Sequence, residues 1–192
     1  LSFTSIENLQ GGAGPDTLDL ASLPGTRDVQ LSAVDSNGFS GVDAAISSFS
    51  GIDTIVATTM AGDSITGINA AASFDLDGTP TYAAGGETLA LSDFEVFTGN
   101  AGQDAFLISG TQSATANGGT GDDSISFADG AVLNGVFSGG SGTDTVDLGS
   151  YTSSLSIALT ALGTTDGFQV QAQTGGGVQV GCEYRQVGVC CL

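Results

Sequence analysis

A glycine-rich phrase that recurs along the chain constrains its fold more than any other feature. Each copy is a glycine turn, then an aspartate, then alternating apolar residues, and the four full copies begin at Gly11, Gly99, Gly118 and Gly139. A shorter relative spans residues 61–65. Alternation of apolar and polar residues is typical of a strand with one buried face. The repeating unit therefore contains a glycine turn, an aspartate and a strand.

A second phrase precedes the glycine turn and also alternates apolar residues around an acid. Its copies cover residues 3–9, 49–55 and 91–97, with Glu7, Asp53 and Glu95 as the acids. We expect these three acids to lie on a solvated face, because alternation turns every second side chain away from the buried side.

The spacing of the glycine turns predicts the architecture. Gly99, Gly118 and Gly139 are about 20 residues apart, which is the coil length of a solenoid. We predict an all-β fold, a parallel β-helix or β-roll solenoid, over residues 1–174, with roughly nine or ten coils. The earlier turns are near multiples of this spacing apart, as if intervening coils had lost their glycines. Residues 42–49 have an apolar spacing that leaves a short helix open.

The last part of the chain differs in composition from the repeats. Residues 175–192 are rich in glycine, valine and cysteine, and we interpret them as a tail or a cap on the end of the stack. Cys182, Cys190 and Cys191 all lie there. In an oxidising compartment Cys182 could pair with either of the others and leave one thiol for an intermolecular bond, or all three could stay unpaired.

Charge excludes several classes of partner. The formal net charge is −19, with 21 acidic residues against Arg27 and Arg185. No basic patch can form, so nucleic acid and anionic membrane surfaces are poor partners. Close carboxylates repel one another, and divalent cations would relieve that repulsion. The 40% hydrophobic content and the 31 glycines favour a folded chain with many turns over a disordered acidic one.

The sequence predicts neither a membrane span nor a signal peptide. No apolar run approaches the roughly 20 residues of a membrane span, so we predict no direct membrane insertion. The first residues lack the basic and apolar regions of a signal peptide. Because residues 1–9 already look like the middle of a repeat, we expect the chain to be a piece of a longer protein with its secretion signal elsewhere.

The phrase Gly-Gly-x-Gly-x-Asp-x-apolar resembles the nonapeptide of RTX, hemolysin-type calcium-binding proteins, with residues 118–125 as the best match. The longer pattern from Gly62 to Tyr151 is similar to the repeats of giant bacterial hemagglutinin-like adhesins. These resemblances imply a secreted protein of the bacterial cell surface or extracellular matrix. They also imply an adhesive or scaffolding role, with glycans, other surface proteins or copies of itself as partners.

The RTX resemblance implies calcium between stacked turns, although RTX repeats have two motifs per coil and this chain has one. The copies at Gly99, Gly118 and Gly139 could still stack on one edge. The predicted ligands are Asp104, Asp122, Asp123 and Asp144, with Asp16 in an isolated site, because carboxylates and turn carbonyls are hard oxygen ligands. The alternative is that each aspartate accepts hydrogen bonds from backbone amides of its own turn.

Two other functions stay open from the sequence. Polysaccharide-cleaving β-helices are enzymes, but their chemistry on acidic sugars needs a base or a cation, and the two arginines are isolated. Paired carboxylates could hydrolyse glycosides, yet no pair stands out. We therefore predict a protein that is not an enzyme. A self-assembling extracellular filament, joined through exposed coil ends and the terminal thiols, is the main alternative.

Overall fold

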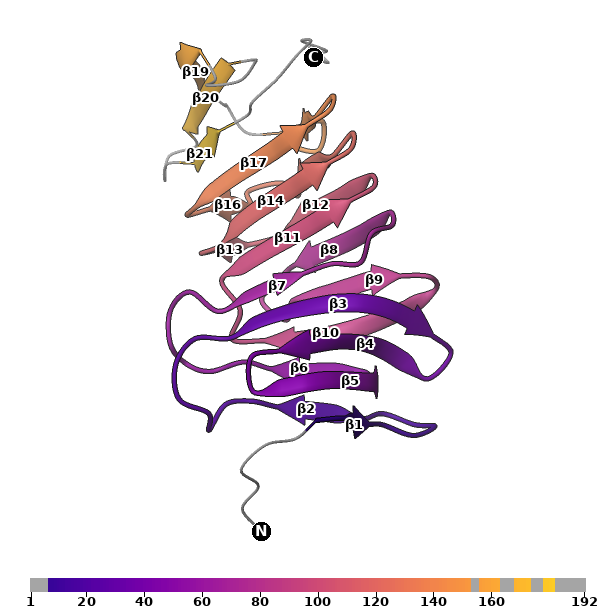
Figure 1. Ribbon diagram of the computed structural model, residues 1–192. Coiled ribbons are helices and arrows are strands. Elements are labelled where there is room, and N and C mark those ends of the chain that lie inside the picture. Colours follow the sequence, from indigo (N-terminus) through magenta and orange to yellow (C-terminus); the bar gives the residue numbers. More distant parts are fainter. Residues whose placement is uncertain (1–6, 153–155, 163–167, 174–177, 182–192) are drawn as a thin grey trace.

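The computed structural model describes residues 7–152, 156–162, 168–173 and 178–181, with side chains described for residues 7–152. These residues form strands, turns and bends, and none of them is helical. The predicted all-β class is therefore confirmed. Most strands are stacked along one direction, from the N-terminal end to the C-terminal end (Figure 1). Among the described residues there is no apolar helix that could span a membrane.

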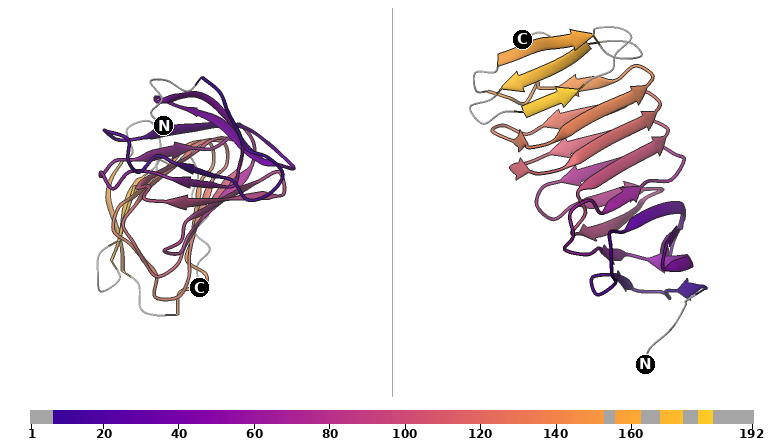
Figure 2. Two further views of the ribbon diagram at one scale, coloured as in Figure 1. Left: turned by 90° about the horizontal axis from the view of Figure 1, so that it is seen from below. Right: turned by 60° about the vertical axis from the view of Figure 1, so that its left-hand side comes forward.

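Two eight-stranded sheets, named here sheet A and sheet B, form the body of the molecule. In spatial order, sheet A contains β1 (Leu9–Gln10), β5 (Ile46–Ile52), β4 (Gly38–Asp43), β3 (Asp28–Asp35), β7 (Ser64–Thr66), β11 (Val96–Ala101), β14 (Thr115–Thr120) and β17 (Val136–Ser141). Sheet B contains β2 (Thr17–Asp19), β6 (Thr54–Val56), β10 (Glu87–Ser92), β9 (Thr81–Ala84), β8 (Ala72–Leu76), β12 (Asp104–Ile108), β15 (Ser124–Phe127) and β18 (Thr145–Asp147). Figure 2 shows both stacks from two further directions.

From β11 onward the chain follows a regular path that alternates between the sheets. Every pairing among β11, β14 and β17, and among β12, β15 and β18, is parallel. In sheet B, Ala105, Ser124 and Thr145 are register partners. Equivalent aspartates are 19 and 21 residues apart. The predicted repeat spacing is therefore present over residues 96–147.

Between residues 28 and 92 each sheet contains an antiparallel three-stranded meander, β3–β4–β5 in sheet A and β8–β9–β10 in sheet B. The outer strands of each meander pair in parallel with the regular strands on either side. These meanders account for the long separations between the early glycine turns. The expectation that those separations were coils without glycine is wrong, because the antiparallel strands of the meanders occupy them. Among the described residues each sheet contains eight strands, meander strands included, so the expected nine or ten coils are too many.

Residues 42–49, which left a helix open, form the end of one strand, a turn at residues 44–45 and the start of the next strand. Val42 lies in β4, and Ile46 and Phe49 lie in β5. The pairing of β4 with β5 contains a register shift between Gly41 and Asp43. Such a bulge places an extra residue in one strand, so Ile46 and Phe49 both face the core although they are three positions apart. The helix-like spacing is therefore a bulged strand.

One hydrophobic core runs between the two sheets. Its aromatic residues touch from the meanders into the regular half, with the rings of Phe74 and Phe106 stacked at 5.0 Å between centroids and Tyr82 4.8 Å from Phe74. Phe137 meets Phe106 edge to face at 5.8 Å. Each such side chain contributes about 1.5–3 kcal/mol when fully buried. The core therefore joins the regular and irregular halves into one packed unit.

Smaller sheets complete the structure. β13 (Thr111–Gln112) and β16 (Val132–Leu133) form a short parallel pair. β19 (Ser156–Leu162), β20 (Phe168–Gln173) and β21 (Val178–Gly181) form an antiparallel sheet, and β21 lies close to β17. The predicted boundary at residue 175, the three cysteines and Arg185 lie outside the described residues.

Candidate functional site

Three of the predicted metal ligands lie in a column where the chain enters sheet B. Asp104 begins β12, Asp123 immediately precedes β15 and Asp144 immediately precedes β18. Their exposed fractions are 1%, 1% and 8%. Because β12, β15 and β18 pair in parallel and in register, the three aspartates stack on consecutive layers. We call these three residues the aspartate column.

Each carboxylate in the column accepts a hydrogen bond from the backbone of the preceding layer. Ala72 N donates to Asp104 Oδ1 at 3.0 Å, Asp104 N donates to Asp123 Oδ1 at 2.8 Å, and Asp123 N donates to Asp144 Oδ1 at 3.0 Å. The alternative from the sequence placed these bonds within each turn. The structure instead places them between turns, so the side chains link successive layers.

The first glycine of each motif makes room for the aspartate five residues later. A Cβ atom at Gly99, Gly118 or Gly139 would overlap the Oδ2 atom of Asp104, Asp123 or Asp144, respectively. At Gly118 it would also overlap the backbone oxygen of Gly139 in the next layer. Any larger residue at this position would push the carboxylate out of the corner. The spacing of glycine and aspartate is therefore explained by packing alone.

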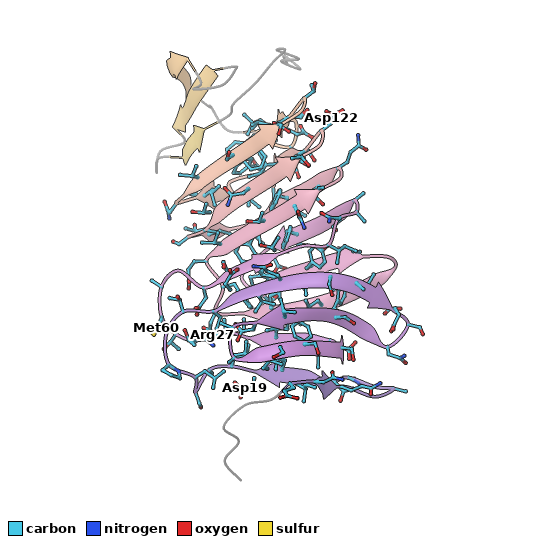
Figure 3. The ribbon with its side chains drawn as sticks, viewed as in Figure 1. Asp19, Arg27, Met60 and Asp122 are labelled. Atoms are coloured by element: carbon cyan, nitrogen blue, oxygen red, sulfur yellow. The ribbon has the colours of Figure 1, made fainter. Side chains whose placement is uncertain are left out.

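Asp122 and Asp16 lie outside the column. Asp122, labelled in Figure 3, is exposed on the turn before β15. Its Oδ1 accepts a hydrogen bond from Thr143 N at 2.8 Å. Asp16 precedes β2 near the N-terminal end and accepts from Gly12 N at 2.7 Å. The structure thus brings together Asp104, Asp123 and Asp144, places Asp122 beside them on the surface, and keeps Asp16 apart.

The aspartate column has unusual electrostatics. Burial raises the pKa of Asp104 to about 7, the Asp123 carboxylate adds to the rise, and the Ala72 amide opposes it. Burial also raises the pKa of Asp123, opposed by the Asp104 amide and reinforced by Asp144 and Asp122. Within residues 7–152, no donor bonds Oδ2 of Asp104 or of Asp123. Protonation of Asp104 near neutral pH removes both the cost of burying its charge and its repulsion by the Asp123 carboxylate.

A second set of acids, at the connections from sheet B to sheet A, was not recognised from the sequence as a site. Asp63 is fully buried and accepts hydrogen bonds from Arg27 N and from Thr58 Oγ1, the latter at 2.6 Å. Glu95 Oε2 accepts from Gly62 N and Asp63 N at 2.9 and 3.0 Å. The signal that could have found it is the shortened motif at residues 61–65, which keeps its aspartate.

The acids expected on a solvated face divide into two groups. Glu7 is exposed, as expected. Asp53 and Glu95 are half-buried, and Asp53 Oδ2 accepts a hydrogen bond from Asp16 N at 2.9 Å. Backbone amides of neighbouring layers therefore hold Asp53 and Glu95, just as they hold the aspartate column.

Arg27 forms a buried ion pair that was not predicted from the sequence. Its Nη1 lies 3.2 Å from Asp43 Oδ1, and the two residues are 7% and 6% exposed. Arg27 Nη2 also donates to the Pro24 carbonyl at 2.8 Å, and Ala45 N donates to Asp43 Oδ1 at 2.9 Å. Arg27 is labelled in Figure 3 beside the connections that rise from sheet B to sheet A. It is therefore a structural residue instead of an isolated surface cation.

The donor set fits calcium only in part. Carboxylate oxygens are suitable ligands, but Ca²⁺ takes 6–8 oxygens. Within the part of the chain that the structure describes, no group of three or more acidic, histidine or cysteine side chains is close enough to hold one ion. In the column, Oδ1 is used by an amide and Oδ2 lies against a glycine. Calcium binding by Asp16, Asp104, Asp122, Asp123 and Asp144 stays a prediction.

Comparison with models of protein families, with characterised proteins and with solved structures finds no match to this chain. The resemblance to RTX and hemagglutinin-like repeats therefore stays a prediction based on the motifs themselves.

Proposed function

We propose that the chain is a β-solenoid scaffold segment of a secreted bacterial surface protein, in which coils of about 20 residues carry an adhesive surface. The observation that supports this most is the in-register parallel stacking of β11, β14 and β17 and of β12, β15 and β18. Such stacking is the geometry of repeat proteins in which each unit contacts only its neighbours and can be extended indefinitely.

In this proposal the aspartate column has a structural role. A hydrogen bond to a charged acceptor contributes roughly 1.5–3 kcal/mol, and an amide left without a partner in the interior costs a similar amount. Asp123 both accepts from the layer below and donates to the layer above. The column therefore holds consecutive coils in register at the corner where a turn would otherwise separate them.

The disposition of the charged groups favours a binding or scaffolding role over catalysis. Asp104 has a perturbed pKa, which is common for catalytic groups, but at 1% exposed it has no access to a substrate. Arg27 is committed to Asp43 and the Pro24 carbonyl, so it is unavailable to an acidic sugar. Neutral glycans or other surface proteins are the partners that such an acidic surface does not repel.

The scaffold proposal and its calcium component are tested by different measurements. Scattering in solution should give an elongated particle, and beads coated with the protein should be retained under flow on glycan-coated surfaces more than beads coated with an unrelated acidic protein. A compact particle, or equal retention of both kinds of bead, would overturn the proposal. Reducing-end release from polysaccharides would instead establish an enzyme.

Thermal unfolding with and without calcium tests the metal prediction. Sites present only in the folded state raise Tm with free calcium by mass action. Magnesium at equal ionic strength is the control, because screening alone also stabilises an acidic protein. Equal shifts with the two ions would contradict specific calcium sites and leave the scaffold proposal intact.

A further inference from the structure

The strand order of the N-terminal half differs from a simple stack in a way that bears on mechanical load. In a simple stack, each new strand is added to the outer edge of the sheet, so the last coil can be removed without disturbing the others. This holds for β17 and β18, which among the strands that the structure describes pair only with β14 and β15, respectively. Removing them exposes β14 and β15 in the same way.

The two meanders do not follow this rule. β10 is the last strand of its meander, yet it lies inside sheet B between β9 and β6. β3 is the first strand of its meander, yet it lies inside sheet A between β4 and β7. A pulling force applied from the C-terminal side reaches the two meanders at β10, and a force applied from the N-terminal side reaches them at β3. Both strands have partners on both sides.

The connections between the sheets reinforce this arrangement. The chain rises from β2 to β3, from β6 to β7 and from β10 to β11 along one side of the stack (Figure 1). Arg27 N and Thr58 Oγ1 both donate to Asp63, and Asp63 N donates to Glu95. Asp63 therefore ties all three connections together, and the Arg27–Asp43 ion pair fastens the first of them to β4.

We propose that residues 28–92 form an interlocked module that acts as a mechanical stop, beneath coils that unwind one at a time from the C-terminal side. Pulling on residue 95 must break two ladders of a single strand together, those of β10 with β6 and with β9. Each strand of the outermost regular coil is held by one ladder, β17 to β14 in sheet A and β18 to β15 in sheet B. The stop follows from strand order and stands independently of the adhesive role.

Single-molecule force spectroscopy on the complete chain, held by marker domains at both ends, tests the stop. After any event from residues beyond 152, we expect steps of roughly 6 nm as each coil of about 20 residues extends, followed at higher force by one step of roughly 20 nm for residues 28–92. Equal small steps down to the N-terminal end, a single event for the whole chain, or the large step occurring first would each overturn the proposal.

Two variants sharpen this test. Asp63→Ala should lower the force of the large step and leave the small steps unchanged, because it removes the carboxylate that accepts hydrogen bonds from Arg27 N and Thr58 Oγ1, while the bond from Asp63 N to Glu95 stays in place. Asp122→Ala is the matched control, since Asp122 is exposed in the regular half, and it should leave the large step unchanged. A lower force for the small steps and not for the large one in Asp63→Ala would contradict the assignment.

Discussion

The regular half of the molecule, residues 96–147, and the meander half, residues 28–92, differ in how their successive layers are connected. In the regular half, buried carboxylates link identical corners of successive layers. In the meander half, antiparallel hairpins connect the layers, together with the single Asp63 carboxylate and the ion pair of Asp43 with Arg27, which lies just before β3. Because the regular half repeats, its stability depends on the same contact in every layer, that of the first motif glycine with the aspartate five residues later, which we call the glycine corner. Because the meander half does not repeat, its stability depends on single residues.

The largest expected effect lies in the meander half. Arg27→Ala leaves Asp43 buried without its cation, which costs about 3–5 kcal/mol of unfolding free energy. Denaturant unfolding measures the loss. The paired replacement Arg27→Met with Asp43→Leu is the control, because it removes both charges and should recover most of the stability. A loss below about 1 kcal/mol in Arg27→Ala would show that this half does not depend on the ion pair.

The next effect tests the regular half. Gly118→Ala places a methyl group on the Asp123 carboxylate and on the Gly139 carbonyl, so we expect a loss of about 1–3 kcal/mol from overpacking. Gly12→Ala is the matched control from the same motif, because its Cβ would have 4.0 Å of clearance from Asp16 Oδ2. Equal unfolding free energies for the two variants would refute the account of the glycine corner.

Removing one carboxylate from the aspartate column should have a similar or smaller effect. Asp123→Ala leaves the Asp104 amide without its acceptor, at a cost of about 1–3 kcal/mol, partly offset by lower repulsion. Asp123→Asn keeps an acceptor oxygen and removes the charge, so its Tm at pH 8 should equal or exceed that of the unchanged protein. If the asparagine variant is as unstable as the alanine variant, the linking hydrogen bond is not the source of stability.

The last comparison is the dependence of stability on pH. The pKa of Asp104 is raised to about 7, against about 3.9 for an unfolded aspartate. Asp104 therefore binds its proton more tightly in the folded state than in the unfolded state. Its contribution to the free energy of unfolding is complete below pH ~3.9 and is lost as the pH rises through about 7. We expect Tm to fall between pH 5 and pH 8, and the fall to shrink in Asp104→Asn but not in exposed Asp122→Asn. Equal slopes in both variants would contradict the assignment.

The difference between the halves also explains what the sequence could predict. The regular half repeats its motif at nearly constant spacing, so alternation and glycine turns indicated its strands, its spacing and the stacking of Asp104, Asp123 and Asp144. The structural role of the glycine corner was missed because it depends on contact between a side chain and the backbone of the next layer, which a sequence pattern does not encode.

The meander half has no repeated spacing, and strand partners there are chosen by long-range packing. Local signals existed: Gly85 and Gly86 both have positive φ in the two-residue turn between β9 and β10, a common hairpin turn. Such a turn predicts a hairpin but not which strands flank it. Arg27 is a single residue without a pattern, so its burial beside Asp43 could be found only from the folded structure.

Amide hydrogen exchange at the aspartate column tests most directly whether side chains hold the layers together. In the unchanged protein the amides of Ala72, Asp104 and Asp123 should exchange slowly, because each donates to the carboxylate of the following layer. In Asp123→Ala, the account predicts faster exchange at Asp104 with little change at Ala72. Unchanged protection at Asp104, or equal loss at both amides, would contradict it.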